Sequence, residues 1–179
     1  MAVRCPWRCL LSDLGDIPDP LALENQVCFA LAVASRTVIA VYRPLLEPMG
    51  LTHPQYLVML ALWQHAPLSV KDLSRLLQLE PATLSPLLKR LEANGFVHRL
   101  RASDDERSLA VTLTPAGRRL RDEAEKIPAT IVGRLEMEPA ELQHLHRMLT
   151  QVIAAANKAN TANNANHSHQ AVRGQAPAS

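Results

Sequence analysis

Proline and glycine divide the middle of this chain into short segments of defined type. Ser69 supplies a capping hydroxyl before a stretch of helical periodicity, and Asp72, three residues later, has the position of its capping-box partner. Residues 78–80 form a short break before Pro81, which suits the first turn of a helix, and Gly95 ends the helix that begins there. This pattern predicts two helices joined by a tight turn, which is the geometry of a helix-turn-helix.

Strand-like alternation follows the second predicted helix. Residues 96–101 and 108–113 alternate between apolar and polar side chains around the polar residues 102–107. The alternation predicts a two-stranded hairpin, which in this position is the wing of a winged helix-turn-helix. Arg107, near the hairpin tip, suits the negative potential of a DNA minor groove. We therefore expect this part of the chain to bind DNA.

Three other charged residues of the predicted wing have different expected roles. Asp105 would repel DNA phosphates if it pointed outward, so we expect it to support the wing by holding Arg107 through a charge-assisted hydrogen bond. Arg99 and Arg101 lie on the first predicted strand and are candidate phosphate contacts.

The second predicted helix has an apolar face and a polar face. The residues spaced at i, i+3, i+4 and i+7 predict the buried face: Leu84, Leu87, Leu88 and Leu91. The polar face begins with hydroxyls and continues with cations: Thr83, Ser85, Lys89 and Arg90. Short hydroxyls allow close approach to base edges, and cations suit phosphates. We predict that these four polar residues contact DNA.

Composition narrows the possible functions only a little. The formal net charge of +2 is too small to indicate DNA binding, so that prediction depends on where Arg and Lys lie. We find no apolar run close to the roughly 20 residues that span a bilayer and no secretory signal, so we expect a cytoplasmic protein without a membrane partner. Three cysteines, all early in the chain, argue against a disulfide scaffold. No cofactor or metal is predicted.

The sequence predicts one domain between two extensions. Residues 21–156 have the pattern of a mainly α domain with six helices and a small β-wing. Its DNA-binding lobe spans about residues 52–113, between helical segments at about 21–47 and 114–156, the latter interrupted at Pro128. Residues 1–20 show no clear period and are expected to be loosely ordered. Residues 157–179 are rich in Ala, Asn, His, Gln and Ser and are expected to be disordered.

The sequence TLSPLLKRLEANG, which ends at Gly95, together with DDER at residues 104–107, resembles the MarR family of winged helix-turn-helix regulators. The resemblance extends over about residues 26–153. It implies a transcriptional regulator, not an enzyme, which forms an obligate homodimer through its first and last helices. It also implies that double-stranded DNA is bound as a palindromic operator, one half to each subunit.

Three further segments are similar to the organic-hydroperoxide-resistance repressors within that family: VCFAL (27–31), YRPLL (42–46) and LTHPQYL (51–57). The similarity implies that organic hydroperoxide is the inducer and that Cys28 is the redox-sensing thiol. It also implies that Tyr42 of the partner subunit hydrogen-bonds this thiol. Ala32 and His53 occupy positions at which such repressors often carry tyrosine, and we expect His53 to act as a replacement donor.

The spacing along the first helix fits a contact between subunits. Tyr42 lies 14 residues after Cys28, which is about 21 Å at ~1.5 Å per residue, so the two side chains of one chain cannot meet. Both lie on nearly the same helical face. An antiparallel crossing of two such helices near Ser35 brings Cys28 to Tyr42 of the partner subunit.

The sequence leaves several alternatives open. Cys5 and Cys9 are candidate resolving thiols for oxidised Cys28; otherwise a small thiol forms a mixed disulfide with it. The main alternative function is a regulator released by a small aromatic ligand, with Cys28 only packed in the core. A thiol peroxidase is less favoured because no matched acid–base group accompanies the cysteine. A metal site at Cys28 and His53 lacks further ligands nearby.

Overall fold

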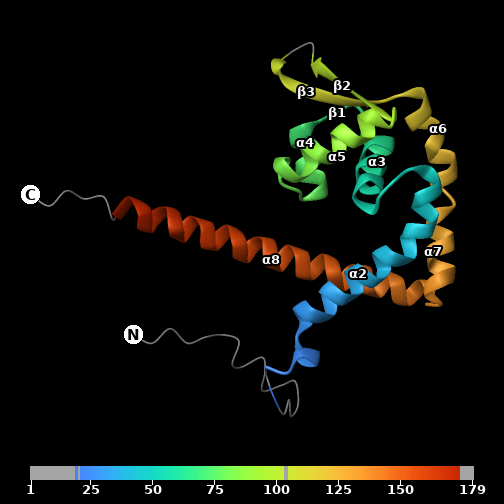
Figure 1. Ribbon diagram of the computed structural model, residues 1–179. Coiled ribbons are helices and arrows are strands. Elements are labelled where there is room, and N and C mark those ends of the chain that lie inside the picture. The colour runs from blue at the N-terminus through green and yellow to red at the C-terminus, as the bar shows by residue number, and fades with distance from the viewer. Residues whose placement is uncertain (1–18, 20, 103–104, 174–179) are drawn as a thin grey trace, which may run out of the picture. The chain divides into compact units, whose positions relative to one another are not determined.

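The computed structural model describes residue 19, residues 21–102 and residues 105–173, with side chains described except at 101–109 and 163–173. The chain divides into two compact units, Met1–Ile127 and Pro128–Ser179. The described part of the first unit contains helices, 3-10 turns and three strands (Figure 1): η1 (Leu23–Asn25), α2 (Val27–Leu46), η2 (Glu47–Met49), α3 (His53–His65), β1 (Leu68–Ser69), α4 (Val70–Leu77), α5 (Pro81–Ala93), β2 (Val97–Ala102), β3 (Asp105–Leu113) and α6 (Pro115–Ala124).

The long helix α2 leaves most of its side chains exposed in the single chain. Of its 20 residues only Leu46 is buried, and the exposed ones include Phe29 and Leu31. Pro44 lies in its last turns, and Gly50, with a left-handed φ of 68°, ends the turn that follows. The end of this helix is as the sequence predicts. Its start is later, at Val27, because η1 precedes it as a separate turn.

The expectation that no apolar segment is long enough to span a bilayer is wrong. The stretch Val27–Met49 has 23 residues and a mean hydropathy of 1.4, and by length and composition it is able to cross a membrane. Arg36 and Arg43 interrupt the apolar residues in the sequence, and the structure joins the residues on either side of each into one helical stretch. Helices that pack against other protein surfaces have the same length and composition, so this property alone does not identify a membrane segment.

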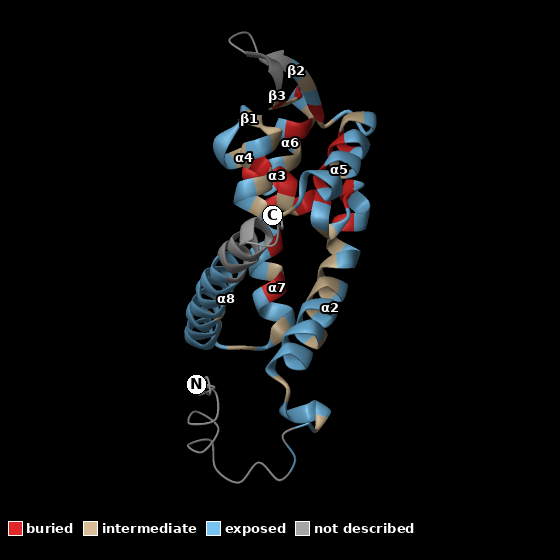
Figure 2. Ribbon diagram, turned by 90° about the vertical axis from the view of Figure 1, so that its left-hand side faces the viewer, coloured by how far each residue is buried: buried red, intermediate tan, exposed pale blue. Residues whose placement is uncertain are grey.

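The core of the first unit lies around α3, α5 and the inner ends of the strands (Figure 2). α3 buries residues around most of its circumference, among them Tyr56, Met59 and Leu62. At its N-terminus the Gln55 side-chain oxygen accepts a hydrogen bond from the Thr52 backbone N–H at 2.8 Å. α3 therefore starts from a capped end and buries six of its 13 residues.

The helix-turn-helix is confirmed at its capping positions. Ser69 Oγ accepts from the Asp72 backbone N–H at 3.0 Å and donates to the Asp72 carboxylate at 2.7 Å. Gln78, with a left-handed φ of 51°, ends α4. Pro81 begins α5, and Gly95 has a φ of 74° just beyond the end of that helix.

The sheet is antiparallel with the strand order β1–β3–β2. β2 and β3 form the predicted hairpin, in which Arg99 pairs with Val111 and Val97 with Leu113. The short strand β1 was not predicted, because two residues beside the Ser69 cap are too few to show alternation. β1 pairs with β3 at Ala110 and Val111, on the side of β3 opposite to β2, and so attaches the base of the wing to the lobe.

The start of α6 joins the wing root to α3. Thr114 Oγ1 accepts from the Gly117 N–H at 2.9 Å and donates to the Gly95 carbonyl at 2.7 Å. The Trp63 indole N–H donates to the Gly117 carbonyl at 2.8 Å. A side chain at position 117 would overlap the Phe96 carbonyl oxygen, so glycine permits this close approach.

The C-terminal helices are α7 (Ile127–Leu135) and α8 (Pro139–Arg173). The interruption predicted at Pro128 appears as the break between α6 and α7. Counted with this pair as one interrupted helix, the described residues contain the six helices that the sequence predicts. The expected end near Ala156 is wrong, because α8 continues to Arg173 where a disordered tail was expected. No proline or glycine occurs between Pro139 and Gly174, and alanine, which is frequent in this segment, is the strongest helix former.

Candidate nucleic-acid interface and thiol-bearing helix

The recognition helix α5 separates its two faces as the sequence predicts. Leu84, Leu88 and Leu91 are fully buried, and Leu87 is partly buried. The four polar residues predicted to contact DNA are all exposed: Thr83, Ser85, Lys89 and Arg90. The N-terminal part of this face carries hydroxyls, and the C-terminal part carries positive charge. This arrangement allows base contacts and phosphate contacts from one helix.

Arg99, a candidate phosphate contact in the sequence, is paired with a carboxylate in the structure. Its guanidinium contacts the Glu92 carboxylate of α5 through Nη2 at 2.7 Å and through Nε at 2.8 Å. The backbone N–H of Arg99 donates to the other carboxylate oxygen at 3.0 Å. These hydrogen bonds from Arg99 lower the pKa of Glu92, so the pair stays ionised. The sequence interpretation missed Glu92 because its partner lies seven residues away on a different type of element.

The tip of the wing is described only in part. The backbone places Arg101 on β2 and both Asp105 and Arg107 on β3. The side chains of these three residues lie outside the described ones, so the predicted support of Arg107 by Asp105 stays a prediction. The same holds for Arg101 as a phosphate contact.

Cys28 is a free, exposed cysteine in the first turn of α2. Ser35 and Tyr42 follow it at intervals of seven residues on the same unbroken helix, so all three lie near one face. The structure therefore separates Cys28 from Tyr42 within one chain. Cys5 and Cys9, the candidate resolving thiols, lie outside the described residues.

Tyr42 meets a group of rings from α3. Its ring centroid lies 5.2 Å from that of His53, in an edge-to-face arrangement at 74°, and 6.1 Å from that of Tyr56. Burial lowers the pKa of His53 and, together with the neighbouring Tyr42, raises the pKa of Tyr56. His53 is therefore a neutral hydrogen-bonding group near neutral pH, and Tyr56 keeps its hydroxyl proton. We call these three residues, Tyr42, His53 and Tyr56, the ring cluster.

The ring cluster agrees in part with the sequence interpretation. Tyr42 and His53 are brought together, as is expected of two donors to one thiol. Tyr56 was not among the predicted site residues, although its spacing of three residues from His53 on a helix placed both on one side. Trp63 continues the row of rings, with its centroid 6.3 Å from that of Tyr56.

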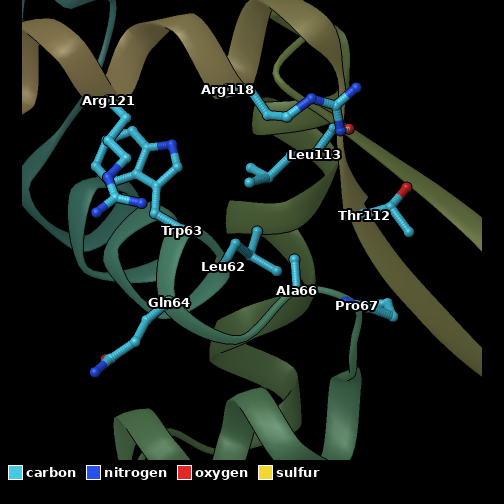
Figure 3. Close-up of a pocket in the computed structure, with 9 residues that line it drawn as sticks. All are labelled: Leu62, Trp63, Gln64, Ala66, Pro67, Thr112, Leu113, Arg118 and Arg121. Atoms are coloured by element: carbon cyan, nitrogen blue, oxygen red, sulfur yellow. Dashed lines mark hydrogen bonds between the residues drawn. The ribbon is translucent and has the colours of Figure 1, made fainter.

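A pocket of about 450 Å³ lies where the end of α3 meets β3 and α6. Figure 3 shows Trp63 on α3 together with Arg118 and Arg121, which project from α6. Arg118 donates to the Leu113 carbonyl at 2.8 Å, and Arg121 pairs with Glu125 at 3.2 Å. The pocket is thus partly apolar and basic. Among the described residues, no group of three or more His, Cys, Asp or Glu side chains is arranged to hold a metal ion.

Comparisons with known proteins agree with this geometry. The model of the MarR family matches residues 51–109, which run from the start of α3 into the wing. The chain is 39% identical over 142 residues to an organic hydroperoxide resistance transcriptional regulator from Bacillus subtilis (strain 168), covering 79% of this chain and 97% of that relative. The chain belongs to the MarR family.

Other MarR-type relatives extend the match. The chain is 41% identical over 159 residues to the HTH-type transcriptional regulator TtmR of Methylorubrum extorquens (strain PA1), covering 87% of this chain and 81% of that relative. The structure is similar to overoxidized AbfR bound to DNA, with a TM-score of 0.62, 36% identity, and coverage of 73% of this chain and 92% of the other. AbfR of Staphylococcus epidermidis gives a TM-score of 0.65 at 35% identity, covering 76% and 94%. The protein is therefore a DNA-binding MarR transcriptional regulator and not an enzyme.

Proposed function

We propose that this protein is a cytoplasmic, homodimeric repressor that releases a palindromic operator when an organic hydroperoxide oxidises Cys28. One supporting observation is its similarity to a regulator of organic hydroperoxide resistance. Another is its similarity to AbfR, which has been crystallised on DNA in an overoxidized and in a reduced form. The Cys28 mechanism itself rests on the residues of α2 and α3.

The observation that carries the proposal is the exposure of Cys28 on an apolar helix. A cysteine that only fills the core is inaccessible to an oxidant, whereas Cys28 is accessible in the single chain. It shares a face of α2 with Tyr42, to which the rest of the ring cluster is attached. If two copies of α2 cross antiparallel near Ser35, each Cys28 lies beside the ring cluster of the other subunit.

The same crossing would cover the exposed apolar side chains of α2 with the α2 helix of the partner subunit. Phe29 and Leu31 lie close to Cys28 in sequence and are exposed in the single chain. Burying such side chains against a second copy removes apolar surface from water at roughly 25 cal/mol per Å². We therefore assign the exposed surface of α2 to subunit association and not to a bilayer.

The proposed chemistry begins with attack by the Cys28 thiolate on the terminal peroxide oxygen. The O–O bond breaks, the sulfur becomes a sulfenic acid, and the departing alkoxide takes a proton and leaves as an alcohol. A thiol then condenses with the sulfenic acid to give a disulfide and water. Hydrogen-bond donors of the ring cluster hold the thiolate before the attack and lose this acceptor once the sulfur is oxidised.

Ala32 and His53 stand where the organic-hydroperoxide-resistance repressors often carry tyrosine, and they change the hydrogen-bond donors available to the thiolate. Ala32 supplies no hydroxyl, so one tyrosine donor is absent. His53 lies against Tyr42, and because burial lowers its pKa it acts as a neutral N–H donor and not as a cation. The resolving thiol is either Cys5 or Cys9 of this protein or a small thiol that forms a mixed disulfide.

A ligand-released regulator is the second candidate function. The observation that favours it is the pocket between α3, β3 and α6, which combines the Trp63 ring with two arginines. Such a lining suits a small aromatic anion. In that case Cys28 has no part in release.

A titration of DNA binding distinguishes the two functions. The reduced protein first selects a duplex from a random-sequence pool. Affinity for this selected duplex is then measured with and without cumene hydroperoxide, alongside the intact mass. We expect the wild type to lose about tenfold or more in affinity and to recover with dithiothreitol. Its mass should show an added oxygen atom, a thiol adduct, or the loss of two hydrogens that an intramolecular disulfide gives. Cys28→Ser should stay bound.

The double variant Cys5→Ser/Cys9→Ser is the matched control. It should still release DNA. If the oxidised wild type has the mass of an intramolecular disulfide and this variant does not, one of the two residues is the resolving thiol. Release of Cys28→Ser by the peroxide contradicts the proposal. So does a wild-type protein that gains oxygen at Cys28 without losing affinity.

A further inference from the structure

Glu92 of α5 and Arg99 of β2 form an ion pair that crosses from the recognition helix to the wing. Three contacts hold it: two from the guanidinium, at 2.7 and 2.8 Å, and one from the Arg99 backbone N–H, at 3.0 Å. The side chains are 28% and 34% exposed for Arg99 and Glu92, respectively. Two other ion pairs between described side chains join residues only three or four positions apart in the sequence, and both are more exposed.

The direction of Arg99 on its strand explains this contact. Side chains alternate across a strand, and Val97, two residues earlier, is fully buried while His98 and Leu100 are exposed. Arg99 therefore lies on the inward face of β2, toward α5. This is the reverse of the outward direction that a phosphate contact requires.

The connection between α5 and β2 is a short turn. Only residues 94–96 separate the two elements, and Gly95 among them has a left-handed backbone. A backbone hydrogen bond from the Phe96 N–H to the Leu91 carbonyl, at 3.0 Å, closes this turn. Thr114 also holds this turn, through its hydrogen bond to the Gly95 carbonyl. The Glu92–Arg99 pair adds a direct side-chain attachment between α5 and β2 farther along the strand.

The negative charge of Glu92 should by itself oppose DNA binding, because it repels phosphates. Its pairing with Arg99 gives this charge a structural role. Its carboxylate lies on the same helix as Lys89 and Arg90, close in sequence to the cations expected to meet phosphates. A winged helix-turn-helix also needs a fixed angle between its parts, because helix and wing enter different grooves of one duplex. We propose that Glu92 and Arg99 are positioning residues, which set the angle of the wing to the recognition helix and do not themselves contact phosphates.

The first test asks whether Glu92→Gln strengthens or weakens DNA binding. Glu92→Gln removes a negative charge near the DNA, so electrostatics alone predicts equal or tighter binding. The proposal predicts the opposite: reduced Glu92→Gln binds the selected duplex about tenfold more weakly, while its affinity for a scrambled duplex stays within about twofold of the wild type. The control Glu125→Gln makes the same charge change and breaks the ion pair with Arg121 in α6. It should not weaken binding.

Two further tests separate positioning from direct contact. In a double-mutant cycle, Glu92→Gln/Arg99→Gln should bind the selected duplex no more weakly than the weaker single variant, because both remove the same pair. In the second test, the charges are exchanged by adding Arg99→Glu to the Glu92→Arg variant. Electrostatics predicts a further loss of affinity, whereas the proposal predicts recovery, because an attractive pair is restored.

Equal or tighter binding by Glu92→Gln overturns the proposal, and so do additive losses in the cycle. Thermal unfolding sets a temperature at which every variant is folded, and the charge reversal supplies the answer if Glu92→Gln does not fold. All measurements use reduced protein. Their outcome is therefore independent of whether Cys28 senses peroxide.

Discussion

His53 gives the protein a predicted dependence of stability on pH. Its ring lies against Tyr42, and burial lowers its pKa below the usual 6.5. The unfolded chain therefore binds a proton at a higher pH than the folded one, and stability falls as the pH drops below about 6.5 toward the pKa of the folded state. We expect the wild type to lose on the order of a few degrees in Tm between pH 7 and pH 5.5 beyond what His53→Gln loses.

His65 provides the comparison for this prediction. It ends the same helix and is exposed, so His65→Gln should keep the pH dependence of the wild type. Tm is measured by circular dichroism across the pH series for all three proteins. If His53→Gln and the wild type lose the same number of degrees, burial of His53 does not control stability in this range.

The exposed residues of α5 should contribute differently to sequence-specific and to nonspecific DNA affinity. Lys89→Gln removes a phosphate contact, so affinity for the selected and the scrambled duplex should fall alike. The slope of log K against log salt should decrease in magnitude by about 0.9. Ser85→Ala should weaken only the selected duplex, by about 1–3 kcal/mol, with an unchanged slope. Titrations at several salt concentrations check both expectations, and identical behaviour of the two variants would count against the assignment.

Elements with local signals were predictable from the sequence. Ser69, Pro81 and Gly95 mark helix ends through groups within a few residues of one another, and the structure follows them. The exposed face of α5 and the wing hairpin were predictable for the same reason, since periodicity is a local property.

Features that depend on distant partners were not predictable. The inward direction of Arg99 follows from packing against Glu92 on another element, and sequence reasoning assigned it to phosphate instead. Strand β1 exists only because β3 lies beside it. The length of α8 was underestimated because low apolar content was taken to outweigh helix propensity and the absence of any breaker before Gly174.

The exposed apolar surface of α2 leads to a prediction about the whole molecule. Leu31 lies one turn from Cys28 and is 36% exposed in the single chain. A glutamate there would be buried without a partner in the proposed dimer, at a cost of several kcal/mol. We expect Leu31→Glu to sediment as a single 19.7 kDa chain at concentrations where the wild type has twice that mass.

Leu76→Glu adds the same charge at an exposed leucine of α4, within the helix-turn-helix, and should remain dimeric. Analytical ultracentrifugation measures all three proteins. A wild-type protein that is monomeric at micromolar concentration, or a Leu31→Glu protein that stays dimeric, contradicts the proposed use of α2.

The position of β3 in the sheet has a mechanical consequence. At Ala110 and Val111 it is bonded to strands on both sides, whereas beyond them toward the tip it has only β2 as a neighbour. The base of the wing is therefore supported from two sides, whereas the described part of β3 before Ala110 is supported by β2 alone. We expect a rotation of the lobe to carry the base of the wing with it, because the two are joined through β1.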